Sequence, residues 1–283
     1  MQLKDMRSQL FVPATSPHLL AKAVQRGADA LIIDLEDSVP LARKQEARGM
    51  AAQALAQLAG QAPLLLRVNA PDELLAADIA GVPMDHVTAV MLPKVESARQ
   101  VQSLATALAR LAPGREGGVP IVALIESARG VVEAQQIAQA HPSLVALGFG
   151  AEDYAAEMSV APHPLSLLWP AQQVTTCARA FGLPCWGLAG SIAEIEDMDA
   201  FARLVAEGRA IGFTGSVCIH PRQVSVVNAG FGPTAQELEW ARKVVDADAE
   251  ARSRGLGAVM LDGKMIDLPI VDRARRWLER AGG

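Results

Sequence analysis

The sequence predicts a (β/α)8 barrel, the TIM barrel, followed by a helical extension at the C-terminus. Short runs rich in Val, Ile and Leu alternate with longer Ala-rich segments along most of the chain, and such runs are typical of buried strands in a parallel sheet. Hydrophobic residues make up 51% of the chain but aromatic residues only 4%, which favours a parallel α/β core over an aromatic-rich β-sandwich. Eight strand-like segments fall within about 220 residues, as expected of one barrel.

Each predicted strand is a short apolar run that is bounded by turn residues or by the start of a helix. In chain order the strands are Ser8–Pro13, Ala30–Leu35, Leu64–Asn69, Ala89–Val95, the runs that open Ile121–Gly130 and Leu144–Tyr154, then Pro184–Leu188 and Gly212–Ile219. The two central runs end in carboxylates, at Glu126 and at Asp153. A carboxylate at the end of a buried strand is costly unless a cation meets it, so these two suggest a shared metal ion.

Helices are predicted between the strands. Ser16 resembles an N-cap with Pro17 at the first helical position, so the first helix should run to about Arg26 and stop at Gly27. The other barrel helices are predicted at Leu41–Leu58, from Ser97 onward, at Pro164–Phe181 and at Ile192–Glu207. Ser159–Trp169, which overlaps the start of the helix at Pro164–Phe181, contains no motif that indicates a role by itself, but its place just after a predicted metal-binding strand suggests a role in specificity.

The chain divides into a barrel, residues 1–230, and an extension, residues 231–283. The extension holds a predicted helix at Ala235–Arg254, a short extended piece at Ala258–Leu268 and a last helix at Ile270–Ala281. Because a barrel is complete after eight units, we expect the extension to act as a lid or an oligomer contact. The alternative fold is a doubly wound open sheet, but the lone GxG of LGFG does not supply a dinucleotide-binding GxGxxG.

Composition and charge exclude several classes of protein. The net charge of −5 argues against a nucleic-acid binder, which usually has a basic face. Cys177, Cys185 and Cys218 are widely spaced among apolar residues, so we expect them to be buried and reduced, with no metal-ligand spacing. The N-terminus lacks an apolar signal core, and no uncharged run approaches about 18 residues. We therefore expect a cytoplasmic protein that does not bind membranes.

Five polar residues lie at or just beyond the carboxyl ends of predicted strands: Glu36, Arg67, Lys94, Glu126 and Asp153. In a barrel these ends converge on one face, where active sites are found. A strand-end salt bridge or a loop cap would explain any one of them, but five equivalent positions favour a common site.

The residue types at this face indicate the chemistry. Glu126 and Asp153, without nearby histidine or cysteine, suit a hard cation such as Mg²⁺. Arg67 can bind a substrate carboxylate through its planar fork. Lys94 could form a Schiff base, although a counter-ion role beside Glu36 or Asp37 is the simpler interpretation. His220 is predicted to hydrogen-bond to the backbone rather than to act on a substrate.

Several motifs together resemble those of a known family. They are LFVPATSPHLLAKAVQRGADALIIDLEDSV, LLLRVNA, VMLPKVES, IVALIESARG, LGFGAEDY, CIHPRQV and LDGKMIDLP. In this order they resemble the CitE-like (citrate lyase β-subunit-like) branch of the HpcH/HpaI aldolase and citrate lyase family. The resemblance implies a Mg²⁺-dependent TIM barrel, with Mn²⁺ as a substitute. It also implies that the barrel makes or breaks a carbon–carbon bond in an acyl-CoA thioester such as malyl-CoA, citramalyl-CoA or a citryl thioester.

The resemblance also implies roles for single residues. Glu126 and Asp153 match the metal ligands, and Arg67 matches the arginine that binds the substrate carboxylate. Asp267 matches a C-terminal aspartate that reaches into a neighbouring subunit's site and transfers a proton. The implied partners are a CoA thioester and a 2-keto acid, in a homotrimer or homohexamer. We rank a stand-alone lyase first, a citrate lyase β subunit second and a non-catalytic binding protein third.

Overall fold

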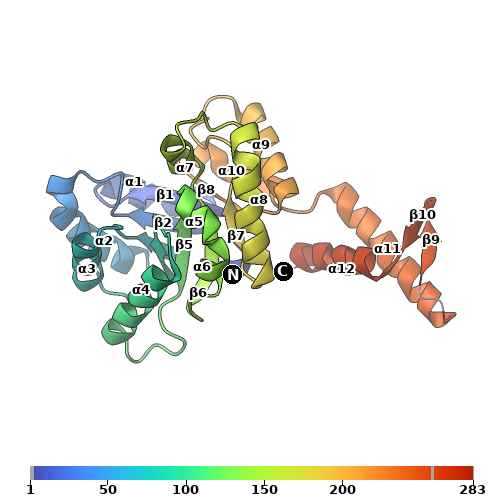
Figure 1. The fold of residues 1–283 in the computed structure, drawn as a ribbon, viewed down its shortest axis with the longest axis horizontal. Helices are drawn as coiled ribbons and strands as arrows, with labels where there is room; N and C mark the ends of the chain where they lie inside the picture. The colour runs from blue at the N-terminus through green and yellow to red at the C-terminus, as the bar shows by residue number, and fades with distance from the viewer. Residues whose placement is uncertain (1–2, 256–257, 283) are drawn as a thin grey trace. The chain divides into compact units, whose positions relative to one another are not determined.

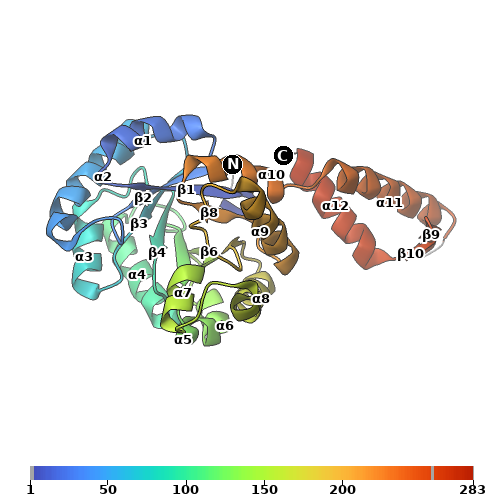
Figure 2. The ribbon, with the colours of Figure 1, turned by 90° about the horizontal axis from the view of Figure 1, so that it is seen from above.

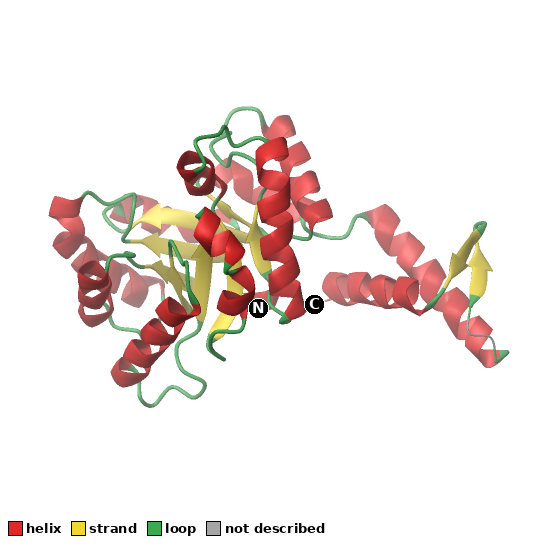
Figure 3. Cartoon of the chain, viewed as in Figure 1, coloured by secondary structure: helices red, strands yellow, loops and turns green. Residues whose placement is uncertain are grey.

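The computed structural model describes residues 3–255 and 258–282. It separates into two compact units, Met1–Phe231 and Gly232–Gly283. The first unit is an eight-stranded parallel sheet with helices on its outer side (Figures 1 and 3). The strands are β1 (Ser8–Pro13), β2 (Ala30–Asp34), β3 (Leu64–Arg67), β4 (Ala89–Leu92), β5 (Ile121–Ile125), β6 (Leu144–Phe149), β7 (Cys185–Gly187) and β8 (Ser216–Cys218).

The sheet curls into a barrel. Its strand order is β7-β6-β5-β4-β3-β2-β1-β8, and the two outermost strands in that order meet through a parallel bridge between Trp186 and Gly215. Gly187 N–H donates to the Gly215 carbonyl at 2.9 Å, and Thr214 N–H donates to the Cys185 carbonyl at 2.8 Å. The predicted TIM barrel is therefore confirmed, and β7 and β8 are the short strands at its seam.

Helices surround the strands (Figure 2). They are α1 (Pro17–Ala23), α2 (Lys44–Leu58), α3 (Asp72–Gly81), α4 (Ala98–Leu111), α5 (Ala128–Val132), α6 (Ala134–Ala138), α7 (Ala151–Glu157), α8 (Pro164–Ala180), α9 (Met198–Ile211) and α10 (Pro221–Gly230), with short 3₁₀ turns at Leu3–Asp5, Val24–Arg26 and Leu41–Arg43. The helical segment that begins with α1 ends at Gly27, as predicted. Gly27 has φ of +74°, a left-handed conformation that glycine adopts readily.

One predicted helix start is wrong. We expected a helix from Ile192, but α9 begins at Met198. The Glu194 carboxylate accepts the N–H groups of Glu196 and Asp197 at 2.8 and 2.9 Å, and this holds a turn instead of a helix. The Asp197 side chain then caps α9 by accepting Ala200 N–H at 2.8 Å.

The alternation of side chains along each strand forms two apolar layers. On β2, Leu31 and Ile33 face the helices and belong to the outer core, whereas Ile32 points into the barrel. Trp186 is also buried inside the barrel. The three cysteines are free and buried, as predicted.

The second unit has a separate small core. It comprises α11 (Ala235–Ser253), an antiparallel hairpin of β9 (Val259–Leu261) and β10 (Lys264–Ile266), and α12 (Leu268–Gly282). The buried residues of this core cluster are Ala241, Val244, Ile266, Val271 and Ala274. None of the helices within residues 3–255 and 258–282 is both long and apolar enough to cross a membrane.

The seam of the barrel yields a stability prediction. A Cβ added at Gly215 would lie 2.4 Å from the Arg7 carbonyl oxygen, a backbone atom that cannot easily move. We expect Gly215→Ala to lower the free energy of unfolding by about 1–3 kcal/mol, measured by denaturant titration. Gly49→Ala is the control: no atom lies within 4 Å of its added Cβ, and Ala in a helix is favoured by about 0.5–1 kcal/mol. An equally stable Gly215→Ala variant would contradict this account.

Candidate active site

The barrel brings the predicted polar residues of the first unit to one end. Arg67 is the last residue of β3 and Glu126 directly follows β5, whereas Glu36 and Lys94 each lie two residues beyond the ends of β2 and β4. Asp153 was expected at a strand end but lies in the first turn of α7, four residues beyond the end of β6. All five therefore sit at the carboxyl side of the barrel, the face on which TIM barrels carry their active sites.

Arg67 is held by a carboxylate that the sequence analysis did not single out. Its Nε donates to Asp34 Oδ1 at 2.7 Å and its Nη2 donates to Asp34 Oδ2 at 2.8 Å. The guanidinium lies over the Phe11 ring, with 4.5 Å between Cζ and the ring centroid. Burial tends to raise the pKa of Asp34, but the hydrogen bonds and charge of Arg67 hold that pKa below its ordinary value. Asp34 is the first carboxylate of the DLED motif, and that was the available signal.

The third nitrogen of Arg67 faces the interior of the site. Its Nη1 lies 3.0 Å from Glu36 Oε2. Burial raises the pKa of Glu36, and it outweighs the opposite effects of Arg67 and Lys94. Since Asp34 occupies the Nε–Nη2 edge, an incoming carboxylate would meet the Nη1 end of Arg67 rather than the edge used by Asp34.

Lys94 connects Glu36 with Glu126. Its Nζ lies 2.8 Å from Glu36 Oε1 and 3.4 Å from Asp37 Oδ1, so the counter-ion contact predicted for it is present. Burial tends to lower the pKa of Lys94, but the hydrogen bond and charge of Glu36 raise it above its ordinary value. Schiff-base formation requires a neutral amine, so this environment disfavours that role. The Lys94 backbone is left-handed, with φ of +54°, and its N–H donates to Glu126 Oε2 at 2.9 Å.

Glu126 is a buried carboxylate that is close to other acids. Only 6% of the residue is exposed. Burial, followed by the negative charges of Asp153 and Glu36, raises the pKa of Glu126 to about 7. Gly150 packs directly against it: a Cβ at this position would lie 2.6 Å from Glu126 Oε1, so only glycine leaves room for the carboxylate. The geometry therefore keeps the buried Glu126 carboxylate near the like charge of Asp153.

A cation would relieve the repulsion between these carboxylates. Within residues 3–255 and 258–282, no group of three or more His, Cys, Asp or Glu side chains is arranged to hold a metal ion. Mg²⁺ does not require such a group, since it usually takes one or two carboxylates and retains several waters. Glu126 and Asp153 are two carboxylates of the number that such an incomplete shell requires.

The remaining predicted residues lie away from this cluster or in the other unit. Asp267 belongs to the second unit, directly before α12, where its carbonyl accepts the N–H groups of Ile270 and Val271. His220 caps α10, and its Nδ1 accepts Arg222 N–H at 3.2 Å, which agrees with the structural role predicted for it. In Ser159–Trp169, the side chains of Leu165 and Trp169 are exposed.

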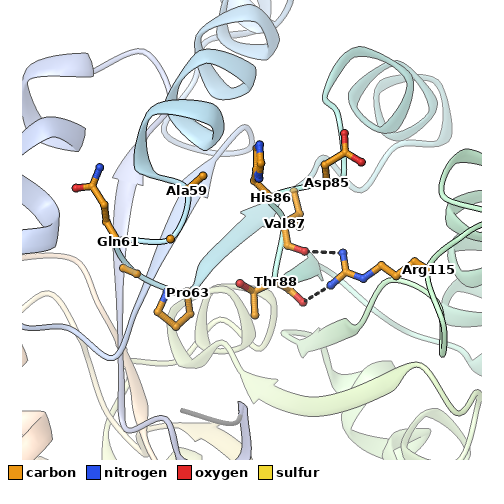
Figure 4. Close-up of a pocket in the computed structure, with 10 residues that line it drawn as sticks. Ala59, Gln61, Pro63, Asp85, His86, Val87, Thr88 and Arg115 are labelled. Carbon is orange, nitrogen blue, oxygen red and sulfur yellow. Dashed lines mark hydrogen bonds between the residues drawn. The ribbon is translucent and has the colours of Figure 1, made fainter.

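The opposite end of the barrel also carries a cavity (Figure 4). It measures about 550 Å³ and is lined by residues that precede β3 and β4, together with Arg115. Arg115 Nη1 donates to the carbonyls of Val87 and Met84 at 2.8 and 3.3 Å, so its guanidinium mainly ties a loop to the barrel. None of the predicted site residues lines this cavity, and the converging polar cluster is the better candidate for an active site.

Comparison with known proteins adds independent evidence. The family model described as HpcH/HpaI aldolase/citrate lyase matches residues 7–221. The citrate lyase subunit beta of Haemophilus influenzae is 36% identical over 99% of this chain and 98% of its own length. A (3S)-malyl-CoA thioesterase of Cereibacter sphaeroides is 34% identical over 99% of this chain and 96% of its own.

A solved structure shows the same fold. It is the Mycobacterium tuberculosis protein CitE in complex with magnesium, acetoacetate and coenzyme A, which matches with a TM-score of 0.80 and 32% identity over 99% of this chain and 100% of that chain. The family match covers most of the barrel, and the relatives match along almost their whole length. The chain therefore belongs to the HpcH/HpaI aldolase/citrate lyase family and is an enzyme of the carbon–carbon lyase class.

Proposed function

We propose that the chain is a stand-alone Mg²⁺-dependent lyase that cleaves a 3-hydroxyacyl-CoA thioester of the malyl-CoA or citramalyl-CoA type. The products would be acetyl-CoA and a 2-keto acid. The observation that carries the proposal is the pairing of buried Glu126 with Asp153 beside Arg67 at the carboxyl end of the barrel. The ligands named for the M. tuberculosis relative, magnesium, acetoacetate and coenzyme A, support this class of substrate.

The residues present fit a divalent cation. The Glu126 carboxylate is buried, burial and the charge of Asp153 raise its pKa, and it fits against the chain only because residue 150 is glycine. Glu126 and Asp153 would hold Mg²⁺, and Mn²⁺ would fit the same oxygen donors. When bound, the ion would supply Lewis-acid stabilisation of negative charge on a substrate oxygen.

Arg67 would bind and orient the substrate carboxylate. Asp34 fixes the guanidinium through two hydrogen bonds, and Phe11 supports its face, so the side chain is rigid before substrate arrives. Its Nη1 end, now close to Glu36, would donate to the substrate. Glu36 and Lys94, which form an ion pair, would shape the polar wall of the substrate pocket.

Asp267 would handle the proton on the acetyl-CoA carbon. In the cleavage direction the substrate hydroxyl gives its proton to a solvent water and its oxygen becomes the keto oxygen of the 2-keto acid. The carbon–carbon bond breaks, and its electron pair stays on the acetyl-CoA fragment as an enolate. Asp267 would donate a proton to that carbon, and in the condensing direction it would remove one. This role is inferred from the family motif. It requires Asp267 of one subunit to reach the active site of a neighbouring subunit in a homotrimer or homohexamer.

The second candidate function is a β subunit of a citrate lyase complex that acts on a carrier-bound citryl thioester. It is favoured by the name and the full-length match of the H. influenzae relative. A dedicated subunit would show weak or no activity on a free CoA thioester, which separates the two functions.

The first prediction concerns activity. Purified chain with Mg²⁺ should release acetyl-CoA and a keto acid from malyl-CoA or citramalyl-CoA, and EDTA should abolish the release. The assay should quantify CoA, acetyl-CoA, keto acid and hydroxy acid by chromatography. Hydroxy acid with free CoA would instead indicate thioester hydrolysis, as named for the C. sphaeroides relative. No release from either ester would favour the carrier-dependent subunit.

The second prediction concerns metal binding, which is measured by its effect on thermal unfolding. Mg²⁺ should stabilise the parent protein, by about 2.7 kcal/mol at a concentration 100 times its Kd, and Glu126→Gln should remove this effect. Glu207 is an exposed carboxylate on α9. Glu207→Gln is the matched control, and Mg²⁺ should stabilise it as much as it stabilises the parent.

The same variant tests the sign of the pH effect. Without metal, Glu126 binds a proton more tightly in the folded than in the unfolded chain, because its folded pKa is about 7. Its contribution to stability is therefore present at low pH and is lost as pH rises through about 7. At pH 8 in EDTA, Glu126→Gln should be at least as stable as the parent, and a large loss of stability would contradict the burial argument.

The third prediction concerns Asp267. Asp267→Asn should lower kcat by about 10²–10⁴-fold, because the amide cannot exchange a proton with the substrate carbon. Asp262→Asn in the turn between β9 and β10 is the control; Asp262 is exposed and has φ of +50°, which Asn tolerates. Full turnover by Asp267→Asn would remove it from the mechanism.

A further inference from the structure

A buried polar network lies behind the turn that follows β2. It consists of Lys44 and Arg48 on α2, Asn69 after β3 and Asp78 on α3. These residues are 8%, 6%, 2% and 0% exposed, respectively. None of them has a role in the chemistry proposed above. Buried ionic groups are costly unless they are paired, so their contacts indicate what part of the structure they maintain.

Lys44 holds two consecutive carbonyl groups of the turn. Its Nζ donates to the carbonyl oxygens of Leu35 and Glu36, both at 2.7 Å. Each carbonyl accepts a second hydrogen bond: Asn69 Nδ2 donates to Leu35 at 3.0 Å, and Val39 N–H donates to Glu36 at 2.9 Å. These hydrogen bonds fix the orientation of two successive peptide groups. They therefore set the direction in which the Glu36 side chain leaves the backbone.

The other residues of the network fix Asn69. Asp78 Oδ2 accepts Asn69 N–H at 2.8 Å and Asn69 Nδ2 at 2.7 Å. Asp78 Oδ1 accepts Arg48 Nε at 2.8 Å. Asn69 lies two residues after Arg67 in the chain. The network therefore joins the turn after β2 to the end of β3, the strand that carries Arg67.

The same turn is connected to Arg67 by Asp34. Besides binding the guanidinium, Asp34 accepts the backbone N–H groups of Glu36 at 2.9 Å and Ser38 at 3.3 Å. A shift of the turn would thus change the surroundings of Asp34 and, through it, the orientation of Arg67. A misplacement of about 1 Å at an orienting group can reduce catalysis about 100-fold.

We propose that Lys44 is a positioning residue whose buried ammonium group holds the turn Leu35–Val39 in the conformation that aims Glu36 and Arg67 at the active site. The proposal rests on the function proposed for Arg67, Glu126 and Asp153. Lys44 itself would touch neither substrate nor metal, because its ammonium group is occupied by the two carbonyls on the inner side of the turn.

The experiment is a double-mutant cycle on lyase turnover. Lys44→Met keeps the length of the side chain but removes its donors, and it should lower kcat/KM by about 10–100-fold. In a Glu36→Gln background, the same substitution should cost less than it does in the parent, because the part of its effect that passes through Glu36 is already lost. Lys22→Met, at an exposed position of α1, is the control and should retain parental kinetics. Additive losses in the cycle would overturn the proposal.

A second readout does not depend on activity. In Lys44→Met, amide hydrogen exchange in a peptide covering Leu35–Val39 should be at least about 10-fold faster, while a peptide covering Ile121–Glu126 should not change. Unchanged exchange in the turn would overturn the proposal even if the parent proved inactive on every ester tested, and parental inactivity alone would count only against the proposed function. Lys44→Gln, which keeps a polar side chain, replaces Lys44→Met in both readouts if the latter does not fold.

Discussion

The ion pair between Asp34 and Arg67 is the contact around which the carboxyl end of the barrel is arranged. The two residues are register partners at the ends of the adjacent parallel strands β2 and β3. The Asp34 side chain is 2% exposed and that of Arg67 is 12% exposed, so removal of either partner would leave a buried charge and cost about 3–5 kcal/mol. This pair fixes the guanidinium, so that the remaining nitrogen, Nη1, lies 3.0 Å from Glu36 Oε2.

Charge is distributed unevenly around the site. On the side of β2 to β4, two cations meet the carboxylates: Arg67 pairs with Asp34, and Lys94 pairs with Glu36. On the side of β5 and α7, Glu126 accepts a backbone N–H from Lys94 and lies near the like charge of Asp153. The first side is neutralised by the protein, whereas the second side is suited to a bound cation. This asymmetry is the physical basis for separating the two proposed roles, orientation by Arg67 and charge stabilisation at Glu126 and Asp153.

The second unit is suited to a separate role because it has a core of its own. Trp240 and Trp277 are 5.6 Å apart, and the Arg273 guanidinium lies 5.3 and 5.5 Å from their rings. These contacts add to the apolar core of the unit. A rigid unit is what the proposed role of Asp267 requires, since a proton-transferring carboxylate must be presented in one orientation.

The barrel and most of its site residues could be predicted from local patterns. Apolar runs determined the strands, and the strand ends indicated Glu36, Arg67, Lys94 and Glu126, because parallel strands place their carboxyl ends on the same face. Asp153 was predicted at the end of a strand, whereas it lies in the first turn of α7, because the apolar run ends at Phe149 and the residues after Gly150 form a helix. The late start of α9 depended on side-chain caps at Glu194 and Asp197 that hydrophobic periodicity does not report.

Other features were decided only by the tertiary structure. Asp34 and Arg67 are 33 positions apart in the chain, and the strand register determines that they face each other. The left-handed backbone of Lys94 and the burial of Lys44 under the β2 turn likewise depend on neighbours that are distant in the sequence. A sequence pattern specifies which end of a strand a side chain occupies, because that follows from local periodicity. The choice of partner for each charged group depends on packing between strands and helices, and therefore it emerges only in the folded protein.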